Sequence, residues 1–174
     1  MSIKMNPKTS DTLEALLGTL IFLFGLLPFF LVWIPYKIIT SPKIIYVFGL
    51  GEIRYLGMIP IFIGAVVYVW CSNNFVFEGK GSPIPFTPTK KLIVKGLYMF
   101  VRNPLYIAGV MVLTGEALFF QSIGIFIYCL AMFAAFNFHV LMEETLLANQ
   151  FGETYEEYKK HVPRWIPRLT PYRV

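Results

Sequence analysis

The chain has 174 residues, of which 56% are hydrophobic and only 14% are charged, and its mean hydropathy is +0.63. Soluble domains carry roughly 25% charged residues, so this composition excludes an ordinary soluble domain and indicates a membrane protein. The net charge of +5 is expected to orient the chain in the bilayer and to attract anionic lipid. It gives no argument for binding nucleic acid.

Four apolar stretches are candidates for membrane-spanning helices, which need about 20 mostly apolar residues. They are Leu13 to Pro35, Tyr55 to Asn73, Leu105 to Phe120 and Ile123 to Leu141. The first lacks a signal-peptide cleavage site, so we expect a retained anchor. The apolar piece 44–50 either extends the second span or lies at the interface. Only Gln121 and Ser122 separate the last two, which predicts a tight helical hairpin whose first arm is short.

The distribution of basic residues predicts the topology. With four spans, the N-terminus, the loop 74–104 and the segment 142–174 share one side of the membrane. They hold every Lys and Arg except Lys37, Lys43 and Arg54. Because cytosolic loops carry the excess of Lys and Arg, we expect both termini and the loop to be cytosolic. For Glu52, Arg54 and Glu116, near the outer ends of the spans, pairing or snorkelling is favoured over a transport role.

The expected cytosolic loop leads from a Pro- and Gly-rich stretch to the start of the third span. Its residues 79–91 cannot form a regular helix, and their composition fits a linker and an active-site lid equally well. Pro104 suits the first position of a helix, and Asn103 is a preferred N-cap. The start of the helix does not account for Arg102, although arginine is common at a membrane boundary, where its side chain snorkels to the interface.

The fourth span is expected to carry the adjacent carboxylates Glu143 and Glu144 out of the bilayer. Two acids at a helix C-terminus are unfavourable, so either the helix continues or the acids have a cationic partner. A break is expected at residues 149–152. Apolar residues recur at spacings of three and four, which predicts an amphipathic helix that lies against the membrane or folds under the spans. They are Leu147, Phe151, Tyr155, Tyr158 and Val162.

Metal and disulfide chemistry are both disfavoured. The chain has only two histidines and two cysteines. His139 and Glu143 share one helical face, but a packed or hydrogen-bonded histidine is favoured over a metal ligand. Cys71 and Cys129 lie in apolar stretches, where cysteine behaves as a small hydrophobe.

These patterns predict an all-α integral membrane protein with about four transmembrane helices, a cytosolic Pro-rich loop and a C-terminal amphipathic helix. We expect a single membrane domain, residues 1–174. Its parts are the first two spans (13–73), the cytosolic loop (74–104), the helical hairpin (105–141) and the cytosolic C-terminal segment (142–174).

Four segments of the second half form an ordered set. They are residues 92–109 (LIVKGLYMFVRNPLYIAG), the pair Glu143-Glu144, residues 151–158 (FGETYEEY) and residues 162–168 (VPRWIPR). This set resembles the isoprenylcysteine carboxyl methyltransferase family of integral membrane methyltransferases and, more distantly, the phospholipid N-methyltransferases. The resemblance covers about residues 85–168, the expected catalytic core. Asn103 stands where the eukaryotic carboxyl methyltransferases have histidine, and Gly96-Leu-Tyr replaces their usual Gly-Pro-Tyr.

The resemblance implies a site for S-adenosyl-L-methionine that opens to the cytosol for the cofactor and to the bilayer for a lipophilic acceptor. Glu143 and Glu144 suit the ammonium of the cofactor, and Arg102 suits its carboxylate. Tyrosine faces suit its adenine or sulfonium, and Gly109 permits a close approach. The expected cofactor-binding residues are Tyr98, Arg102, Asn103, Pro104, Tyr106, Gly109, Glu143, Glu144, Tyr155 and Tyr158.

The expected reaction is a direct in-line methyl transfer. A carboxylate acceptor needs an orienting cation, for which Arg164 and Arg168 are candidates, and an amine acceptor needs a base, for which Glu144 is the candidate. An isoprenylcysteine-like carboxylate is favoured. The alternatives are a phospholipid amine N-methyltransferase, a non-enzymatic lipid-binding scaffold and, less favoured, a nicotinamide-dependent membrane reductase. The expected partners are the acceptor and membrane lipids; the oligomeric state is left open.

Overall fold

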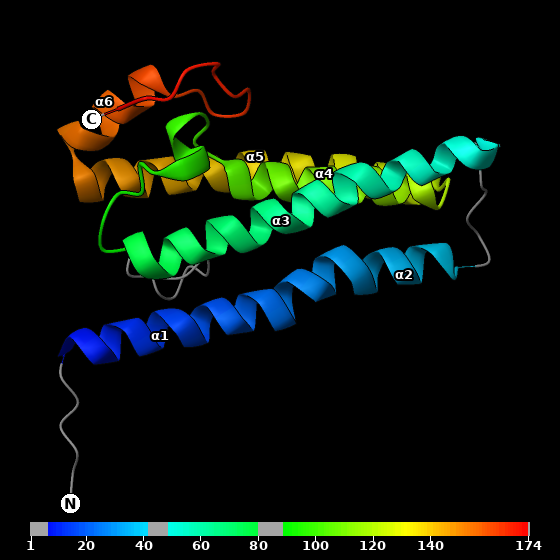
Figure 1. The fold of residues 1–174 in the computed structure, drawn as a ribbon, viewed down its shortest axis with the longest axis horizontal. Coiled ribbons are helices and arrows are strands. Elements are labelled where there is room, and N and C mark those ends of the chain that lie inside the picture. Colours follow the sequence, from blue (N-terminus) through cyan, green and yellow to red (C-terminus); the bar gives the residue numbers. More distant parts are fainter. Residues whose placement is uncertain (1–6, 42–48, 80–88, 174) are drawn as a thin grey trace, which may run out of the picture.

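The computed structural model describes residues 7–41, 49–79 and 89–173, and the regular elements in these ranges are helices (Figure 1). The α-helices of the described ranges are α1 (Pro7–Ile21), α2 (Ile34–Ile39), α3 (Met58–Asn74), α4 (Pro104–Phe119), α5 (Ile123–Phe151) and α6 (Glu153–His161). Short π and 3-10 turns extend or join them. They are η1 (Phe22–Leu26), η2 (Phe29–Trp33), η3 (Gly51–Gly57), η4 (Phe75–Gly79) and η5 (Gly96–Met99). The expected loop residues 80–88 and most of the apolar piece 44–50 lie outside the described ranges.

Among the residues that the structure describes, three helical stretches are long and apolar enough to cross a membrane: Leu13–Ile39, Gly51–Gly79 and Ile123–Phe151. Helix α4 is apolar but has only 16 residues. At about 1.5 Å per residue it is roughly 24 Å long, less than the roughly 30 Å of bilayer hydrocarbon. The structure therefore confirms the predicted all-helical membrane class, with the third predicted span as the short one.

The first two predicted spans are longer in the structure than the sequence indicates. The first helical rod continues beyond Pro35 to Ile39, and it passes Pro28 between the π turns η1 and η2. Such turns accommodate a proline that cannot donate a backbone hydrogen bond. The second continues beyond Asn73 through η4 to Gly79, so the chain is still helical where the loop was predicted to begin.

Helix α4 lies at the centre of the bundle and packs most closely on α3. Small residues make this contact possible. A Cβ atom on Gly64 would lie 2.7 Å from the Ala108 carbonyl oxygen, and one on Gly115 would lie 2.5 Å from the Gly57 carbonyl oxygen. Without a hydrophobic driving force between helices in lipid, close backbone packing is a main source of association. These glycines therefore set the α3–α4 distance.

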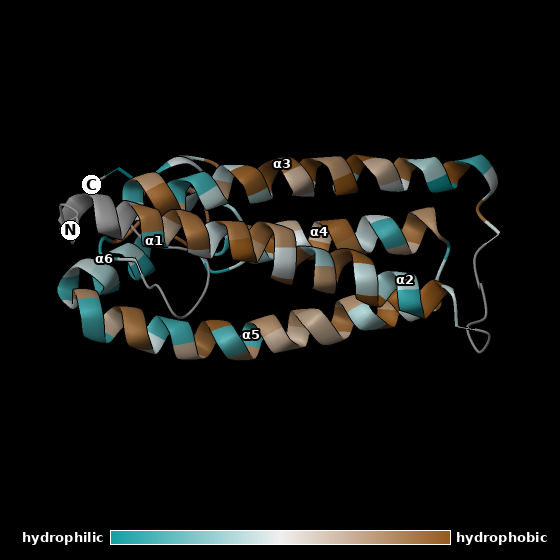
Figure 2. Ribbon diagram, turned by 90° about the horizontal axis from the view of Figure 1, so that it is seen from below, coloured by the Kyte–Doolittle hydropathy of each residue, from teal (hydrophilic) through white to brown (hydrophobic). Residues whose placement is uncertain are grey.

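The rod formed by α1, η1, η2 and α2 runs beside the α3–α4–α5 group (Figure 1). The Phe22 and Tyr68 rings are 6.1 Å apart, and the Tyr128 hydroxyl donates a hydrogen bond to the Phe30 carbonyl at 3.1 Å. Hydrophobic residues run along the rod, α3 and α4, whereas hydrophilic residues gather around α6 (Figure 2). The long helices therefore expose apolar faces, as membrane-spanning helices do.

The predicted hairpin between α4 and α5 is confirmed. Gln121 has a positive φ of 53°, and Ser122 caps α5 by accepting a hydrogen bond from the Ile125 amide at 3.3 Å. The Gln121 side chain also accepts a hydrogen bond from the Leu50 amide at 2.7 Å. The two residues thus close the hairpin and tie it to the start of η3.

Arg54 and Glu116 are among the polar residues at this end of the bundle for which the sequence predicts pairing or snorkelling. Arg54 donates a hydrogen bond to the Tyr55 hydroxyl at 3.0 Å and lies over its ring. Glu116 is predicted to pair or to snorkel, and its buried Oε2 atom has no hydrogen-bond partner among the described residues. Cys71 and Cys129 are free and buried, as expected.

The predicted break after α5 is confirmed at Gly152, which has a φ of 56°. The apolar stripe of α6 is covered by the chain itself: Tyr155, Tyr158 and Val162 are buried against Leu92, Val94 and neighbouring residues. Of the two alternatives for this helix, the structure shows the one in which it folds under the spans. The Tyr158 hydroxyl secures it with a 2.7 Å hydrogen bond to the Tyr98 carbonyl.

Tyr158→Phe is expected to loosen α6 without unfolding the bundle. The substitution leaves the buried Tyr98 carbonyl without its donor, which costs about 1–3 kcal/mol. Hydrogen exchange of the 153–161 amides in detergent should therefore become faster, while exchange in α3 and α4 stays the same. Tyr36→Phe, at an exposed position of α2, is the control. Unchanged protection of α6 would contradict this role of the hydroxyl.

Candidate active site

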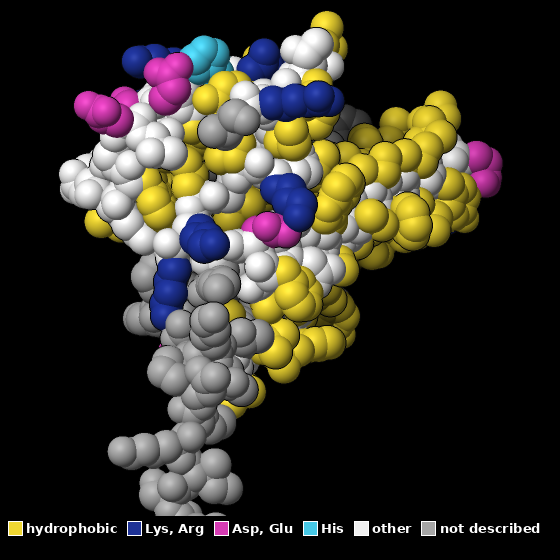
Figure 3. All heavy atoms as spheres, turned by 60° about the vertical axis from the view of Figure 1, so that its left-hand side comes forward, with side chains coloured by type: hydrophobic (Ala, Val, Ile, Leu, Met, Phe, Trp, Pro, Cys, Tyr) yellow, Lys and Arg dark blue, Asp and Glu magenta, His cyan; other side chains and the backbone are white. Residues whose placement is uncertain are grey.

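One end of the bundle, here called the polar end, carries α6, residues 89–103 and the segment after α6 (Figure 1). The start of α1 and the end of η4 also lie at the polar end, whereas the turn between α4 and α5 lies at the opposite end of the bundle. Lys and Arg side chains are spread over this end, beside apolar surface (Figure 3). A pocket opens within it.

The pocket lies between η4, residues 89–103, the end of α5 and α6, with about 500 Å³ of free space including its open mouth. It brings together seven predicted site residues: Tyr98, Arg102, Asn103, Glu143, Glu144, Tyr155 and Tyr158. Sequence reasoning missed the mainly apolar part of its wall, which consists of Phe75, Thr89, Leu92, Ile93, Val140 and Leu147. The pocket is therefore lined by charged and aromatic residues together with hydrophobic ones.

A buried ion cluster forms one side of the pocket. Glu144 accepts two hydrogen bonds from Arg164, at 2.8 and 2.7 Å, and its Oε1 atom lies 3.0 Å from Nη1 of Arg102. The Arg102 and Glu144 side chains are each 9% exposed. The hydrogen bond to Glu144 raises the pKa of Arg164 above its ordinary value. Both alternatives considered for the paired acids therefore hold: α5 continues past them, and Glu144 has cationic partners.

Glu143 has a different environment from Glu144. It accepts a 2.9 Å hydrogen bond from the Tyr106 hydroxyl, and no ion pair joins it to a Lys or Arg of the described ranges. Arg102 also retains an unused donor, because its buried Nε atom has no hydrogen-bond partner among the described residues. Within the part of the chain that the structure describes, the pocket thus contains a carboxylate without a Lys or Arg partner and a guanidinium N–H without an acceptor.

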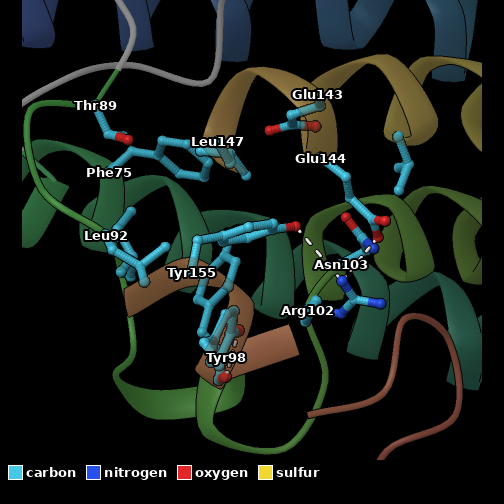
Figure 4. Close-up of a pocket in the computed structure, with 13 residues that line it drawn as sticks. Phe75, Thr89, Leu92, Tyr98, Arg102, Asn103, Glu143, Glu144, Leu147 and Tyr155 are labelled. Carbon is cyan, nitrogen blue, oxygen red and sulfur yellow. Dashed lines mark hydrogen bonds and ion pairs between the residues drawn. The ribbon is translucent and has the colours of Figure 1, made fainter. Parts of the chain in front are cut away.

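Tyrosine rings form the aromatic part of the pocket. Figure 4 shows Tyr155 with its hydroxyl directed toward Arg102, at 3.5 Å from Nη1, and Tyr98 lies below it. Burial raises the pKa of Tyr155 to about 12 and the pKa of Tyr98 well above its ordinary value. Both side chains are therefore neutral at working pH and contribute uncharged aromatic rings to the pocket.

The remaining predicted site residues do not line the pocket. Pro104 begins α4, and Tyr106 stands behind Glu143 as its hydrogen-bond donor. The close approach that Gly109 permits is made by the Tyr68 hydroxyl, which lies 2.6 Å from the position that a Cβ atom on this glycine would occupy. Arg168 donates a 3.0 Å hydrogen bond to the His161 carbonyl.

Asn103 occupies the N-cap position of α4, but the predicted capping bond is absent. Its side chain caps no α4 amide, and its Nδ2 atom donates instead to the Arg164 carbonyl at 3.2 Å. The segment after α6 lies close enough to compete for this side chain, since the Arg102 amide also donates to the Pro163 carbonyl at 2.9 Å. Asn103 therefore ties the start of α4 to that segment.

His139 packs edge-on against Tyr106, with ring centroids 6.0 Å apart. Among the residues that the structure describes, no group of three or more His, Cys, Asp or Glu side chains is arranged to hold a metal ion.

Comparison with known proteins identifies the class. The profile of the phospholipid methyltransferase family matches residues 53–154, which is more than half of the chain. The chain belongs to this family of membrane methyltransferases. The matched region contains α3, α4, α5 and most of the pocket residues.

Three curated proteins are similar over parts of their length. The protein-S-isoprenylcysteine O-methyltransferase of Schizosaccharomyces pombe is 31% identical over 79 residues, which cover 45% of this chain and 34% of that enzyme. The cobalt-zinc-cadmium resistance protein CzcN of Cupriavidus metallidurans is 26% identical over 68% of this chain and 50% of its own. The nickel-cobalt-cadmium resistance protein NccN of Alcaligenes xylosoxydans xylosoxydans is 26% identical over 68% and 51%. The match thus spans a third to a half of each relative. No solved structure matches this chain.

Proposed function

We propose that this chain transfers a methyl group from S-adenosyl-L-methionine to a lipophilic acceptor in the membrane. One observation carries the proposal: Glu143, which has no Lys or Arg partner among the described residues, lines the same pocket as Arg102, whose Nε atom has no acceptor there. The methionine end of the cofactor has an ammonium and a carboxylate, which complement these two groups. Membership in a methyltransferase family supports the same cofactor.

The residues of the pocket divide into ligands and supports. Arg102 would hold the carboxylate of the cofactor and Glu143 its ammonium, while the Tyr98 and Tyr155 faces suit the adenine or the sulfonium. The bound cofactor supplies an electrophilic methyl group. Both oxygens of Glu144 are engaged by arginines, so we assign it to positioning Arg102 and Arg164 rather than to the base or ammonium role predicted from the sequence.

The acceptor is proposed to approach from the membrane side of Arg164. An apolar groove lies there, with walls from α3, α4, α5 and the segment after α6; its residues are Pro60, Ile107, Val110, Met111, Thr114, Phe133 and Trp165. Trp165 follows Arg164 directly, so the cation stands next to this groove. An acceptor with a hydrocarbon chain and a carboxylate matches the pair, which favours an isoprenylcysteine-like substrate.

A phospholipid amine is the second candidate acceptor. An amine is protonated at neutral pH and needs a base. Glu143, the pocket carboxylate that no Lys or Arg of the described ranges pairs with, would then act as this base in place of holding the ammonium of the cofactor. The polar end is proposed to face the cytosol in either case, because cytosolic segments carry the excess of Lys and Arg. Arg168 is the second candidate for an acceptor contact. In the structure its guanidinium donates a hydrogen bond to the His161 carbonyl, so this contact requires that bond to break.

A transfer assay distinguishes the two acceptors. The protein in lipid nanodiscs is incubated with methyl-tritiated S-adenosyl-L-methionine and either N-acetyl-S-farnesylcysteine or phosphatidylethanolamine. We expect the label to appear in the farnesylcysteine, and alkali should release it as methanol. A methyl ester is alkali-labile, whereas an N-methyl group is not. Stable label in the phospholipid would support the amine instead. Transfer to neither by protein that binds the cofactor would contradict both acceptor classes.

Tyr106→Phe is expected to weaken cofactor binding about tenfold, because Glu143 loses the hydrogen bond that fixes its carboxylate. The aromatic packing of the ring against Phe136 and His139 should persist. The affinity for S-adenosylhomocysteine, measured by calorimetry, tests this. Tyr128→Phe is the matched control, because it removes a hydroxyl bond to Phe30 away from the pocket. Equal affinities of the two variants would contradict the role of Tyr106.

A further inference from the structure

The segment after α6, residues 163–172, here called the tail loop, exposes its apolar side chains. Ile166 is 79% exposed and Leu169 is 99% exposed. This contrasts with α6, whose apolar stripe is buried against residues 92–94 and the end of α5. Large apolar side chains clustered in one short loop indicate a contact surface.

The exposure of the tail loop is not that of a loose chain end. The Pro163 carbonyl accepts a hydrogen bond from the Arg102 amide at 2.9 Å, the Arg168 amide donates to the Phe100 carbonyl at 3.0 Å, and the Tyr172 amide donates to the Met99 carbonyl at 2.9 Å. These three bonds fix the loop to residues 99–102. Ile166 and Leu169 are therefore held outward by a defined backbone.

The tail loop runs back along α5 toward its middle (Figure 1). The Trp165 Nε1 atom donates a 2.9 Å hydrogen bond to Asn137 Oδ1, and its ring lies 5.2 Å from that of Phe133. Asn137 follows the start of α5 by fourteen residues, or about 21 Å, within the roughly 30 Å of bilayer hydrocarbon. Glu143 and Glu144 lie about 30 Å along the helix, at the expected boundary.

We propose that the apolar side chains of the tail loop are inserted into the bilayer, with Ile166 and Leu169 in contact with lipid acyl chains, while the Arg168 guanidinium stays at the boundary with the His161 carbonyl. Its surface continues that of the spanning helix, because Phe133, which contacts Trp165, is itself 38% exposed on α5. Asn137 and Trp165 satisfy each other's polar groups at this depth, as groups in hydrocarbon must. Arg164 stays at the boundary with Glu144.

Cysteine labelling in nanodiscs with one copy per disc tests the insertion, since both faces of the bilayer are then open to water. In a background of Cys71→Ala and Cys129→Ala, single variants Ile166→Cys and Leu169→Cys are treated with a charged maleimide. Glu157→Cys on α6 is the control in water, and Phe138→Cys on α5 is the control in lipid; both positions are exposed.

We expect the two tail-loop thiols to react at least about tenfold more slowly than Glu157→Cys, because apolar surroundings disfavour the reactive thiolate. Their rates should resemble that of Phe138→Cys and should rise to that of Glu157→Cys after unfolding in SDS. If the tail-loop thiols react less than about tenfold more slowly than Glu157→Cys, the proposed insertion is overturned. That result would leave the proposed methyl transfer untouched.

A second measurement applies to protein without new cysteines. In Trp33→Phe, Trp70→Phe protein, Trp165 is the single tryptophan, and lipids brominated in the acyl chain should quench its emission. Quenching of the Trp165 emission by acrylamide in water, without quenching by brominated lipid, would overturn the insertion.

Discussion

Replacing Glu144 by Gln is expected to lower methyl transfer by about a hundredfold or more. The carboxylate holds two guanidinium groups, with contacts of 2.7 to 3.0 Å to Arg102 and Arg164. Removing one partner of a buried ion pair leaves uncompensated charge and costs about 3–5 kcal/mol, and each 1.4 kcal/mol is a factor of ten. Transfer rates of the variant in nanodiscs measure the loss.

Two controls separate this effect from a general loss of stability. Glu157→Gln changes an exposed carboxylate that pairs with Lys160 on α6 and should leave transfer unchanged. Glu143→Gln should weaken cofactor binding while the Arg102–Glu144–Arg164 cluster persists. Transfer by Glu144→Gln within a few-fold of the native rate would show that the cluster does not position the site.

Gly115→Leu is expected to prevent correct packing of α4 on α3. A Cβ atom at Gly115 would lie 2.5 Å from the Gly57 carbonyl oxygen and 2.7 Å from a side-chain carbon of Ile61. The helices must separate, because backbone atoms cannot move aside locally, and overpacking costs about 3 kcal/mol. Thermal unfolding in detergent should show a strongly lowered midpoint or aggregation.

Gly25→Leu is the matched control for this prediction. A Cβ atom at Gly25 meets nothing within 4 Å, and leucine is well tolerated on an apolar helix face in lipid. The midpoint of this variant should stay close to the native value. Equal midpoints for the two variants would contradict the role of the glycines in setting the α3–α4 distance.

The helices of this protein were predictable where a local signal exists. Hydropathy located the apolar stretches, Gln121 and Ser122 located the hairpin, and Gly152 located the end of α5. The helix ends were less predictable: Pro35 and Asn73 resemble terminators, but the chain continues as a helix past both. Tertiary packing on α5 and residues 89–103 outweighs these local preferences.

The site was predictable in its polar residues and not in its pairings. Arg102, Glu143 and Glu144 stood out because charge is rare beside the spans. That Glu144 rather than Glu143 binds Arg102 depends on the rotation of α5 against α4, which the sequence does not specify. The apolar wall was missed because Leu92, Val140 and similar residues look like ordinary core residues.

Calorimetric titration of S-adenosylhomocysteine into the protein in nanodiscs tests the cofactor pocket most directly. We expect saturable binding at one site, lost in Arg102→Ala and retained in Lys160→Ala, which removes an exposed cation of α6. Absence of binding by folded protein, or equal binding by both variants, would contradict the assignment of this pocket to S-adenosyl-L-methionine.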